Sequence, residues 1–281
     1  MKLREKIMEI VFLLIASVSI IAVFLICYYL FAEGIPAINE IGWKEFLLGT
    51  VWRPGNNEFG IFPMIVGSVY VTLGAIIVGV PIGLLMAIFM AMFCPDSIHR
   101  FLKPVVDLLA GIPSIIYGFF GLVVVVPYVR EHFDSKGFSI FTASIILGIM
   151  ILPTIISVSE SALRAVPKAY HEGALALGAT PEISAFKVIL PAAKSGVMAA
   201  IVLGIGRAIG ETMAVQMIVG NQPRLPENVF DGVRTMTTNI VLEMGYATDL
   251  HRGALIATGV ILFIFILLIN LAMQLIKRRQ G

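Results

Sequence analysis

Six long apolar stretches dominate this sequence, and each is about as long as a helix must be to cross a bilayer. A membrane-spanning helix needs about 20 mostly apolar residues. The chain of 281 residues is 58% hydrophobic and 14% charged, whereas soluble domains average about 45–50% apolar and about 25% charged residues. The sequence therefore predicts an all-α membrane protein with six transmembrane helices in a single domain, 1–281. The predicted spans are about 7–31, 62–93, 113–129, 138–159, 197–219 and 254–276.

The first span resembles a secretory signal peptide only at first sight. It follows a basic amino-terminal segment, but its apolar stretch is longer than the h-region of about 7–15 residues that signal peptides use. No small-residue cleavage site follows it. We therefore expect an uncleaved span. The second stretch is long for one crossing and is expected to tilt or to extend beyond the lipid.

The distribution of Lys and Arg predicts the orientation, because these residues are enriched on the cytoplasmic side of membrane proteins. With the amino terminus inside, the inner segments carry most of them, including both chain ends. Both termini and the longest inner loop, 160–196, are therefore predicted to be cytoplasmic. The outer segments 32–61 and 220–253 carry acidic and basic residues and are long enough to form a small docking surface.

The sequence offers no motif for catalysis, metal binding or nucleotide binding. Lys194 is the only Lys followed by Ser or Thr, and it lacks the glycine-rich context of a phosphate-binding loop. Cys27 and Cys94 are predicted at opposite membrane faces, which gives no disulfide or metal role. Lys and Arg are scattered, so no nucleic-acid partner is expected. The chain is predicted to be neither an enzyme nor a cofactor-binding protein. The four histidines fall in separate loops: His99, His132, His171 and His251.

Pairs of glycines four residues apart occur in two of the spans. Gly206 and Gly210 lie in the fifth, and Gly79 and Gly83 lie in the second. This spacing lets two membrane helices approach closely. We expect both pairs to be packing sites.

The longest inner loop predicts two short helices joined by a tight turn. Residues 168–177 favour a helix, and Gly178 is the type of residue that ends a helix in a left-handed conformation. Thr180 is suited to cap a second helix whose first position is Pro181. Pro191 is expected to close that helix. Without further information, such a segment is equally compatible with a simple connector.

The spacing within this loop is more specific than its secondary structure. Glu172, Gly178 and the run Val188-Ile-Leu-Pro191 resemble the EAA motif of ABC-importer permeases, with Gly173 in place of the usual Ala and Val188 in place of Ile. In that family the loop is a coupling helix that sits in a groove of an ATPase subunit. The resemblance thus implies that ATP and Mg are used by a partner chain. The coupling residues that it implies are His171, Glu172, Gly173, Ala174, Gly178, Leu190 and Pro191.

Two opposite charges lie near the middle of the fifth predicted span. Arg207 and Glu211 are four residues apart, which puts them about 40° apart on one face of a continuous helix. A charge at the bilayer centre costs roughly 2.5–3.5 kcal/mol on insertion scales. Two interpretations remain open: a structural ion pair that locks neighbouring helices, or a path for an oxyanion that Arg207 attracts and Glu211 moderates.

Five stretches of the sequence, together with the likeness from about residue 10 to the end, point to one family. These stretches are 59–67, 110–118, 207–215, 218–221 and 251–255. They resemble the PstC-type permeases of phosphate ABC importers. The resemblance implies a type I ABC-importer permease bundle in the cell membrane, with Arg207 and Glu211 important for translocation. It also implies four partners: a second, PstA-like permease, PstB-like ATPase subunits, an extracytoplasmic PstS-like phosphate-binding protein and membrane lipid.

Four hydroxyl-bearing residues are weaker candidates for the substrate path. Ser68 and Thr72 share a face of the second span, and Ser114 and Tyr117 lie at the mouth of the third. Hydroxyl groups can line an oxyanion path, but they more often hydrogen-bond to their own helix backbone.

Other functions remain compatible with the sequence. The same machinery could carry sulfate, molybdate or tungstate instead of phosphate. An anion channel or carrier that works without an ATPase is a second alternative, and a membrane scaffold or sensor without transport is a third.

Overall fold

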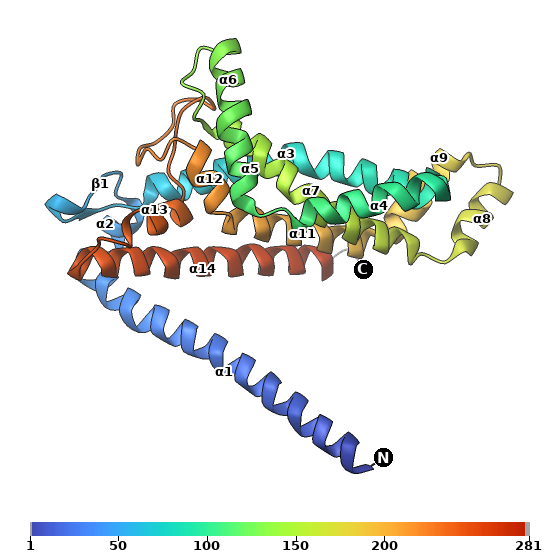
Figure 1. Ribbon diagram of the computed structural model, residues 1–281, viewed down its shortest axis with the longest axis horizontal. Coiled ribbons are helices and arrows are strands. Elements are labelled where there is room, and N and C mark those ends of the chain that lie inside the picture. Colours follow the sequence, from blue (N-terminus) through green and yellow to red (C-terminus); the bar gives the residue numbers. More distant parts are fainter. Residues whose placement is uncertain (1, 279–281) are drawn as a thin grey trace.

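The computed structural model describes residues 2–278, and most of them are helical (Figure 1). The helices are α1 (Lys2–Ile41), α2 (Trp43–Leu48), α3 (Phe62–Ile88), α4 (Asp96–Gly111), α5 (Ser114–Phe120), α6 (Val126–His132), α7 (Ile140–Arg164), α8 (Lys168–Ala176), α9 (Pro181–Ser184), α10 (Leu190–Ala192), α11 (Lys194–Gly210), α12 (Met213–Ile218), α13 (Met236–Glu243) and α14 (Asp249–Arg278). The strands β1 (Trp52–Arg53) and β2 (Glu58–Phe59) pair as a short antiparallel hairpin around a 3-10 turn, Pro54–Asn56. Wide π-helical turns at Phe89–Phe93, Gly121–Val125 and Ala185–Ile189 continue α3, join α5 to α6, and join α9 to α10.

Among the described residues, five helices are long and apolar enough to cross a membrane. A bent pair, Pro181–Ala192 with Lys194–Gly210, passes the same test only when its two parts are taken together; they meet at 74°, so α11 is the part that continues the sixth candidate span. The predicted spans coincide with these helices except for the fifth, 197–219. That span is not one helix, because α11 ends at Gly210 and α12 starts at Met213.

The centre of the bundle is formed by α3 and α7, which pack along their length. Small residues make this close approach possible. A Cβ on Gly79 would lie 2.8 Å from the carbonyl oxygen of Gly148, and one on Gly83 would lie 2.8 Å from the side chain of Ile155. The predicted packing role of this glycine pair is confirmed.

The other glycine pair does not pack against this chain. A Cβ on Gly206 or Gly210 would meet nothing within 4 Å outside its own helix backbone. The prediction of close helix packing at these two positions is therefore wrong for the described residues. Because glycine has no side chain, both positions instead leave the face of α11 beside Arg207 uncovered.

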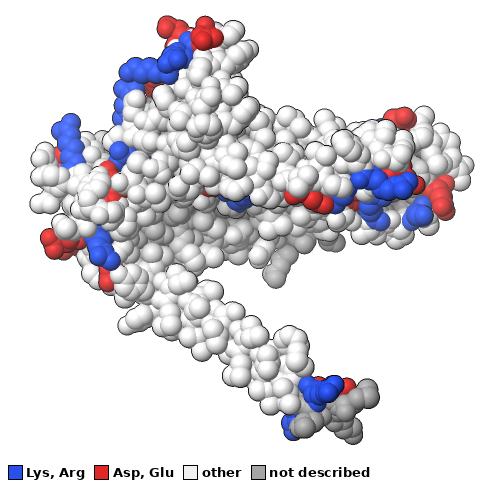
Figure 2. Space-filling view, in the orientation of Figure 1, with Lys and Arg blue, Asp and Glu red and all other residues white. Residues whose placement is uncertain are grey.

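The ends of the chain and its loops are sorted between the two ends of the bundle (Figure 1). The first turn of α1 and the last turn of α14 point toward the end that carries α8 and α9, whereas the β-hairpin, α2 and α13 lie at the opposite end. The predicted six-span topology requires this sorting. On the face drawn in Figure 2, charged side chains gather toward the ends and leave most of α1 and the middle of the bundle uncharged.

A small cap covers the end of the bundle opposite α8 and α9. Its core combines the last turns of α1, helix α2, the hairpin and the starts of α3, α13 and α14, so the two outer segments fold as one unit. The fully or nearly fully buried residues of this cap are Ile38, Phe46, Trp52, Phe59, Ile61, Met64, Met236, Ala254, Leu255 and Ala257.

Helix α4 is an element that the hydropathy pattern does not predict. It is too polar for a span. It packs on α7 through the buried Val106 and through the Lys103 amine, which donates to the Ser157 hydroxyl over 2.9 Å. Other apolar residues stay uncovered, with Phe101 70% and Leu108 71% exposed. This segment is amphipathic, and α7 orders it through side-chain contacts that a search for long apolar runs does not detect.

Candidate transport site and coupling segment

The chain between α11 and α12 is extended, and this break lies at the predicted charged pair. Glu211 follows the last residue of α11 with φ −70° and ψ 127°, and Thr212 has φ −120° and ψ −54°. The carboxylate of Glu211 accepts a hydrogen bond from the backbone N–H of Ala214 over 3.1 Å. Glu211 therefore caps the start of α12, where a negative charge is favourable.

The predicted ion pair between Arg207 and Glu211 is not formed. None of the ion pairs among the described residues includes Arg207. Its guanidinium donates to the hydroxyl of Thr154 on α7 over 3.4 Å, a long contact. The prediction assumed a continuous helix; the break turns the carboxylate toward α12 and leaves the cation without an acidic partner.

The start of α13 connects two of the predicted path residues. The hydroxyl of Ser68 accepts a hydrogen bond from the backbone N–H of Met236 over 2.9 Å. The next residue, Thr237, donates its hydroxyl proton to the carbonyl oxygen of Glu211 over 3.2 Å. Ser68 is 4% exposed, so it holds the outer cap in place rather than lining an open path. Thr72, one turn further along α3, is buried as well.

Helix α5 lies against the other side of the break. A Cβ on Gly118 would lie 2.8 Å from the Cα of Ala214, so α5 and α12 are in direct backbone contact. Tyr117 is buried beside this contact, and its hydroxyl donates to the carbonyl oxygen of Leu109 over 2.9 Å. Ser114 is half-buried at the start of α5. The structure thus brings Tyr117 and Glu211 to one region.

The inner loop has the predicted turn. Gly178 follows α8 with φ +86°, a conformation that costs other L-residues about 1–2 kcal/mol. The hydroxyl of Thr180 accepts from the backbone N–H of Ile183 over 3.4 Å, and Pro181 occupies the first position of α9. A hydrogen bond with Thr180 lowers the pKa of Glu182. The second helix ends at Ala192, one residue after the predicted end at Pro191.

The two short helices of this loop are fixed to each other. The His171 ring nitrogen Nδ1 and the buried Ser184 hydroxyl are 2.8 Å apart, which ties α8 to α9. Large apolar side chains nevertheless stay exposed on this unit: Tyr170 53%, Leu175 39%, Leu177 91%, Ile183 45% and Phe186 45%. Rigid helices that expose such a patch are typical of a protein-docking surface.

Comparison with known proteins identifies the family. The profile described as "Binding-protein-dependent transport system inner membrane component" matches residues 79–281. The chain belongs to this family. It is therefore a multi-pass membrane protein and a component of a transport system rather than an enzyme.

Related sequences and structures agree with this family. The chain is 41% identical to the "Probable ABC transporter permease protein YqgH" of Bacillus subtilis (strain 168), over 91% of this chain and 86% of that protein. It is 33% identical to the "Phosphate transport system permease protein PstC" of Pasteurella multocida, over 96% and 89% of the two chains. A chain of a bacterial ABC transporter involved in the import of the acidic polysaccharide alginate superposes with a TM-score of 0.67 at 17% identity over 99% of both chains. A chain of the inward-facing MetNI methionine ABC transporter gives 0.58 at 22% identity over 79% of this chain and 94% of that chain. The fold is that of the type I ABC-importer permeases.

The permease also contains a buried polar cluster in its outer cap that sequence reasoning missed. Glu243 on α13 accepts hydrogen bonds from Arg234 over 2.5 Å and from the Trp52 indole N–H over 2.8 Å. The His251 ring nitrogen Nε2 lies 2.9 Å from the same carboxylate. The cluster joins the hairpin, α13 and α14. Trp52 is far from the other three members in sequence, and only the mixed charge of the outer loops indicated the cluster.

The variant Glu243→Gln is expected to destabilise the outer cap. It would leave the partly buried Arg234 without its counter-charge, and breaking a buried ion pair costs about 3–5 kcal/mol. Thermal unfolding of the purified permease in detergent measures this loss as a lower midpoint. The matched control is Glu40→Gln, because Glu40 is exposed near the same end. Equal midpoints for the two variants would contradict the assignment.

A second buried cluster lies at the inner end of the bundle. Glu160 on α7 is 3% exposed; its carboxylate lies 2.6 Å from the His99 ring and 2.9 Å from Nε of Arg164. Arg164 also donates to the carbonyl oxygen of Met90 over 2.7 Å. The cluster thus joins α4, α7 and the π-helical end of α3, directly before the coupling segment begins.

Proposed function

We propose that this permease is one of two membrane subunits of an ATP-driven importer and that it carries inorganic phosphate into the cell. The observation that supports this most is Arg207, which has no carboxylate partner among the described residues and lies on the open face of α11, next to the break before α12. The PstC relatives, whose printed names specify phosphate transport, support the choice of cargo. A guanidinium offers paired N–H donors that suit an oxyanion such as phosphate.

The break between α11 and α12 gives Arg207 and Glu211 different surroundings. Glu211 is held by the N–H of Ala214 and by the backbone contact with Thr237, so its position is fixed. Arg207 is held only by the long contact with Thr154 and is free to turn toward a passing anion. A path must attract its ion and also release it. Arg207 supplies the attraction, and the nearby carboxylate of Glu211, which is not bound to Arg207, weakens it enough for release.

The open face of α11 is where we place the second permease. A Cβ on Gly206 or Gly210 would meet nothing within 4 Å among the described residues outside its own helix backbone, and Leu203 on the same helix is 54% exposed. A path between two such faces would be lined by both chains. We propose a PstA-like partner there, in the cell membrane, with both termini of this chain in the cytoplasm.

We assign energy coupling to α8, α9 and the turn at Gly178. The exposed apolar side chains of this unit would dock on a PstB-like ATPase subunit, which would use ATP and Mg. A PstS-like binding protein would deliver phosphate to the outer cap. Coupling residues proposed on this basis are His171, Glu172, Gly173, Ala174, Gly178, Leu190 and Pro191.

Uptake of labelled phosphate tests the proposal in cells that lack their own high-affinity phosphate permease and that receive this chain with its cognate subunits. We expect uptake that phosphate, but not excess sulfate, molybdate or tungstate, competes away, and that an ATPase-inactive partner abolishes. Failure of phosphate uptake in an assembled complex would overturn the cargo. Uptake with the inactive ATPase would indicate a channel or carrier instead.

A further inference from the structure

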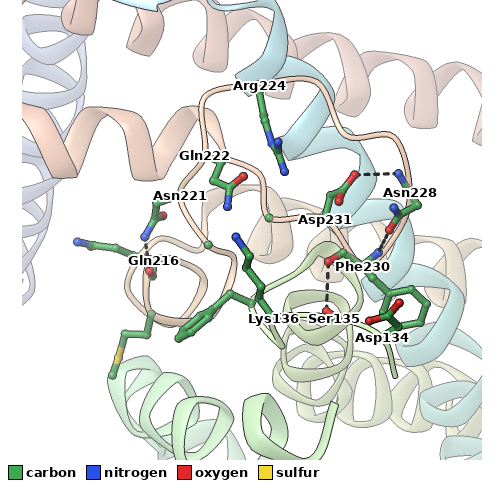
Figure 3. Close-up of a pocket in the computed structure, with 14 residues that line it drawn as sticks. Asp134, Ser135, Lys136, Gln216, Asn221, Gln222, Arg224, Asn228, Phe230 and Asp231 are labelled. Atoms are coloured by element: carbon green, nitrogen blue, oxygen red, sulfur yellow. Dashed lines mark hydrogen bonds between the residues drawn. The ribbon is translucent and has the colours of Figure 1, made fainter. Parts of the chain in front are cut away.

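A pocket of about 630 Å³ lies at the outer end of α12, between two loops that the transport site does not use (Figure 3). One loop, 134–138, joins α6 to α7, and the other, 220–232, follows α12. The lining is largely polar and includes two cations, Lys136 and Arg224, together with the side-chain amide of Gln222. In Figure 3 these three side chains extend from different sides toward the middle of the pocket.

Three donor groups of this pocket are free among the described residues, whereas the carboxylate of Asp231 is occupied. No hydrogen bond or ion pair among the described residues uses the Lys136 amine, the Gln222 side-chain amide or the Arg224 guanidinium. By contrast, the carboxylate of Asp231 accepts from the backbone N–H groups of Glu227 and Asn228 over 2.8 and 3.0 Å.

The same two contacts, together with the positive charge of Arg224, lower the pKa of Asp231. Its negative charge is thus used to shape its own loop.

One acidic side chain in the lining remains unpaired. Asp134 makes no hydrogen bond among the described residues, and in Figure 3 it lies away from the point where the donors meet. Free donors in the middle and an acceptor at the rim suit a small oxyanion rather than a cation. Lys and Arg together supply up to eight N–H donors, enough for several oxygens of one tetrahedral anion.

The position of the pocket relates it to the transport site. Gln216 and Met217, in the last turn of α12, line the pocket, while the first turn of the same helix is capped by Glu211. A helix of this length spans about 9 Å at 1.5 Å per residue. One short helix therefore links the pocket to the break beside Arg207.

We propose that this pocket is an outer binding site for a tetrahedral oxyanion of the phosphate class, held by Lys136, Gln222 and Arg224 before it reaches Arg207. Its link to transport rests on the proposed function. The volume is several times that of one phosphate, so the site would bind weakly and release its anion readily. Conduction through a membrane requires successive sites that each bind the ion weakly.

Binding of inorganic phosphate to the purified permease tests this site without any transport. The chain is held in maltoside detergent, which carries no phosphate, and phosphate is followed by the broadening of its ³¹P signal. The double variant Lys136→Gln/Arg224→Gln is expected to weaken binding by about tenfold. The matched control is Lys44→Gln/Arg53→Gln, which removes two exposed cations from the same end, outside the pocket.

The outcomes separate the site from the proposed function. Equal binding by the two double variants would mean unspecific attraction to surface charge and would overturn the site. Displacement of phosphate by added phosphatidylglycerol would assign the pocket to a lipid headgroup and would also overturn it. Weakened binding in the pocket variant alone would support the site, even if the assembled complex carried no phosphate; that result would overturn only the cargo.

Discussion

Arg207→Gln is expected to stop phosphate uptake while the permease still assembles with its partners. Glutamine can keep the contact with Thr154, but it loses the positive charge and the paired donors that face a passing oxyanion. Hydrogen bonds to charged groups contribute about 1.5–3 kcal/mol, so uptake is expected to fall by about tenfold to a hundredfold. Initial rates of labelled phosphate uptake, normalised to the amount of assembled complex, measure this loss.

The conservative variant Arg207→Lys separates a transport role from a packing role. Lysine keeps the charge without the planar fork, so part of the uptake should return. If Arg207 served instead to lock helices together, Arg207→Gln would lower the yield of intact complex in size-exclusion chromatography. Normal uptake by Arg207→Gln would assign the residue to structure alone.

The difference between the predicted and the observed charged pair has a simple physical origin. Apolar periodicity is continuous through 197–219, because α11 and α12 are both apolar, so the pattern contains no signal for a break at Glu211 and Thr212. The break depends on contacts made elsewhere in the fold. Glu211 is fixed by Thr237, and α12 is fixed by Gly118 on α5.

Local features were accessible to sequence reasoning for the opposite reason. The turn at Gly178, the cap at Thr180 and the helix start at Pro181 each depend on one residue and its immediate neighbours. A long apolar run likewise indicates a membrane span without any knowledge of distant contacts. The helix formed by α3 and its π-helical extension ends at Phe93, which is the predicted end of the second span.

Polar clusters that join residues far apart in the sequence could not be predicted from the sequence. Glu243 meets Trp52 from a hairpin 191 residues away, and Glu160 meets His99 from an amphipathic helix that hydropathy treats as a loop. Each of these residues has an ordinary loop-like neighbourhood in the sequence. Their partners are determined by how α4, α7, α13 and α14 pack, which a single sequence does not encode in local patterns.

The variant Gly178→Val is expected to abolish association with the ATPase while membrane insertion persists. Gly178 has φ +86°, and a Cβ there would meet nothing within 4 Å, so the effect arises from backbone conformation and not from a clash. A β-branched residue is a strong outlier in this region. The turn would open, and α8 and α9 would no longer present their exposed apolar side chains together. Co-purification of the ATPase subunit with a tagged permease measures the loss.

Gly111→Val is the matched control, because it makes the same substitution at a glycine outside the coupling segment. Gly111 is the last residue of α4, its added Cβ also meets nothing within 4 Å, and its φ is not in the left-handed region. Association with the ATPase should therefore be retained. Unchanged co-purification of the ATPase with Gly178→Val would show that the turn is a simple connector, and the coupling role would then have to lie elsewhere on the inner surface. Loss of the permease itself from the membrane fraction would indicate a folding defect. The variant Gly178→Ala has a smaller strain at the same position. It is expected to reach normal membrane levels and to show a partial loss of association with the ATPase.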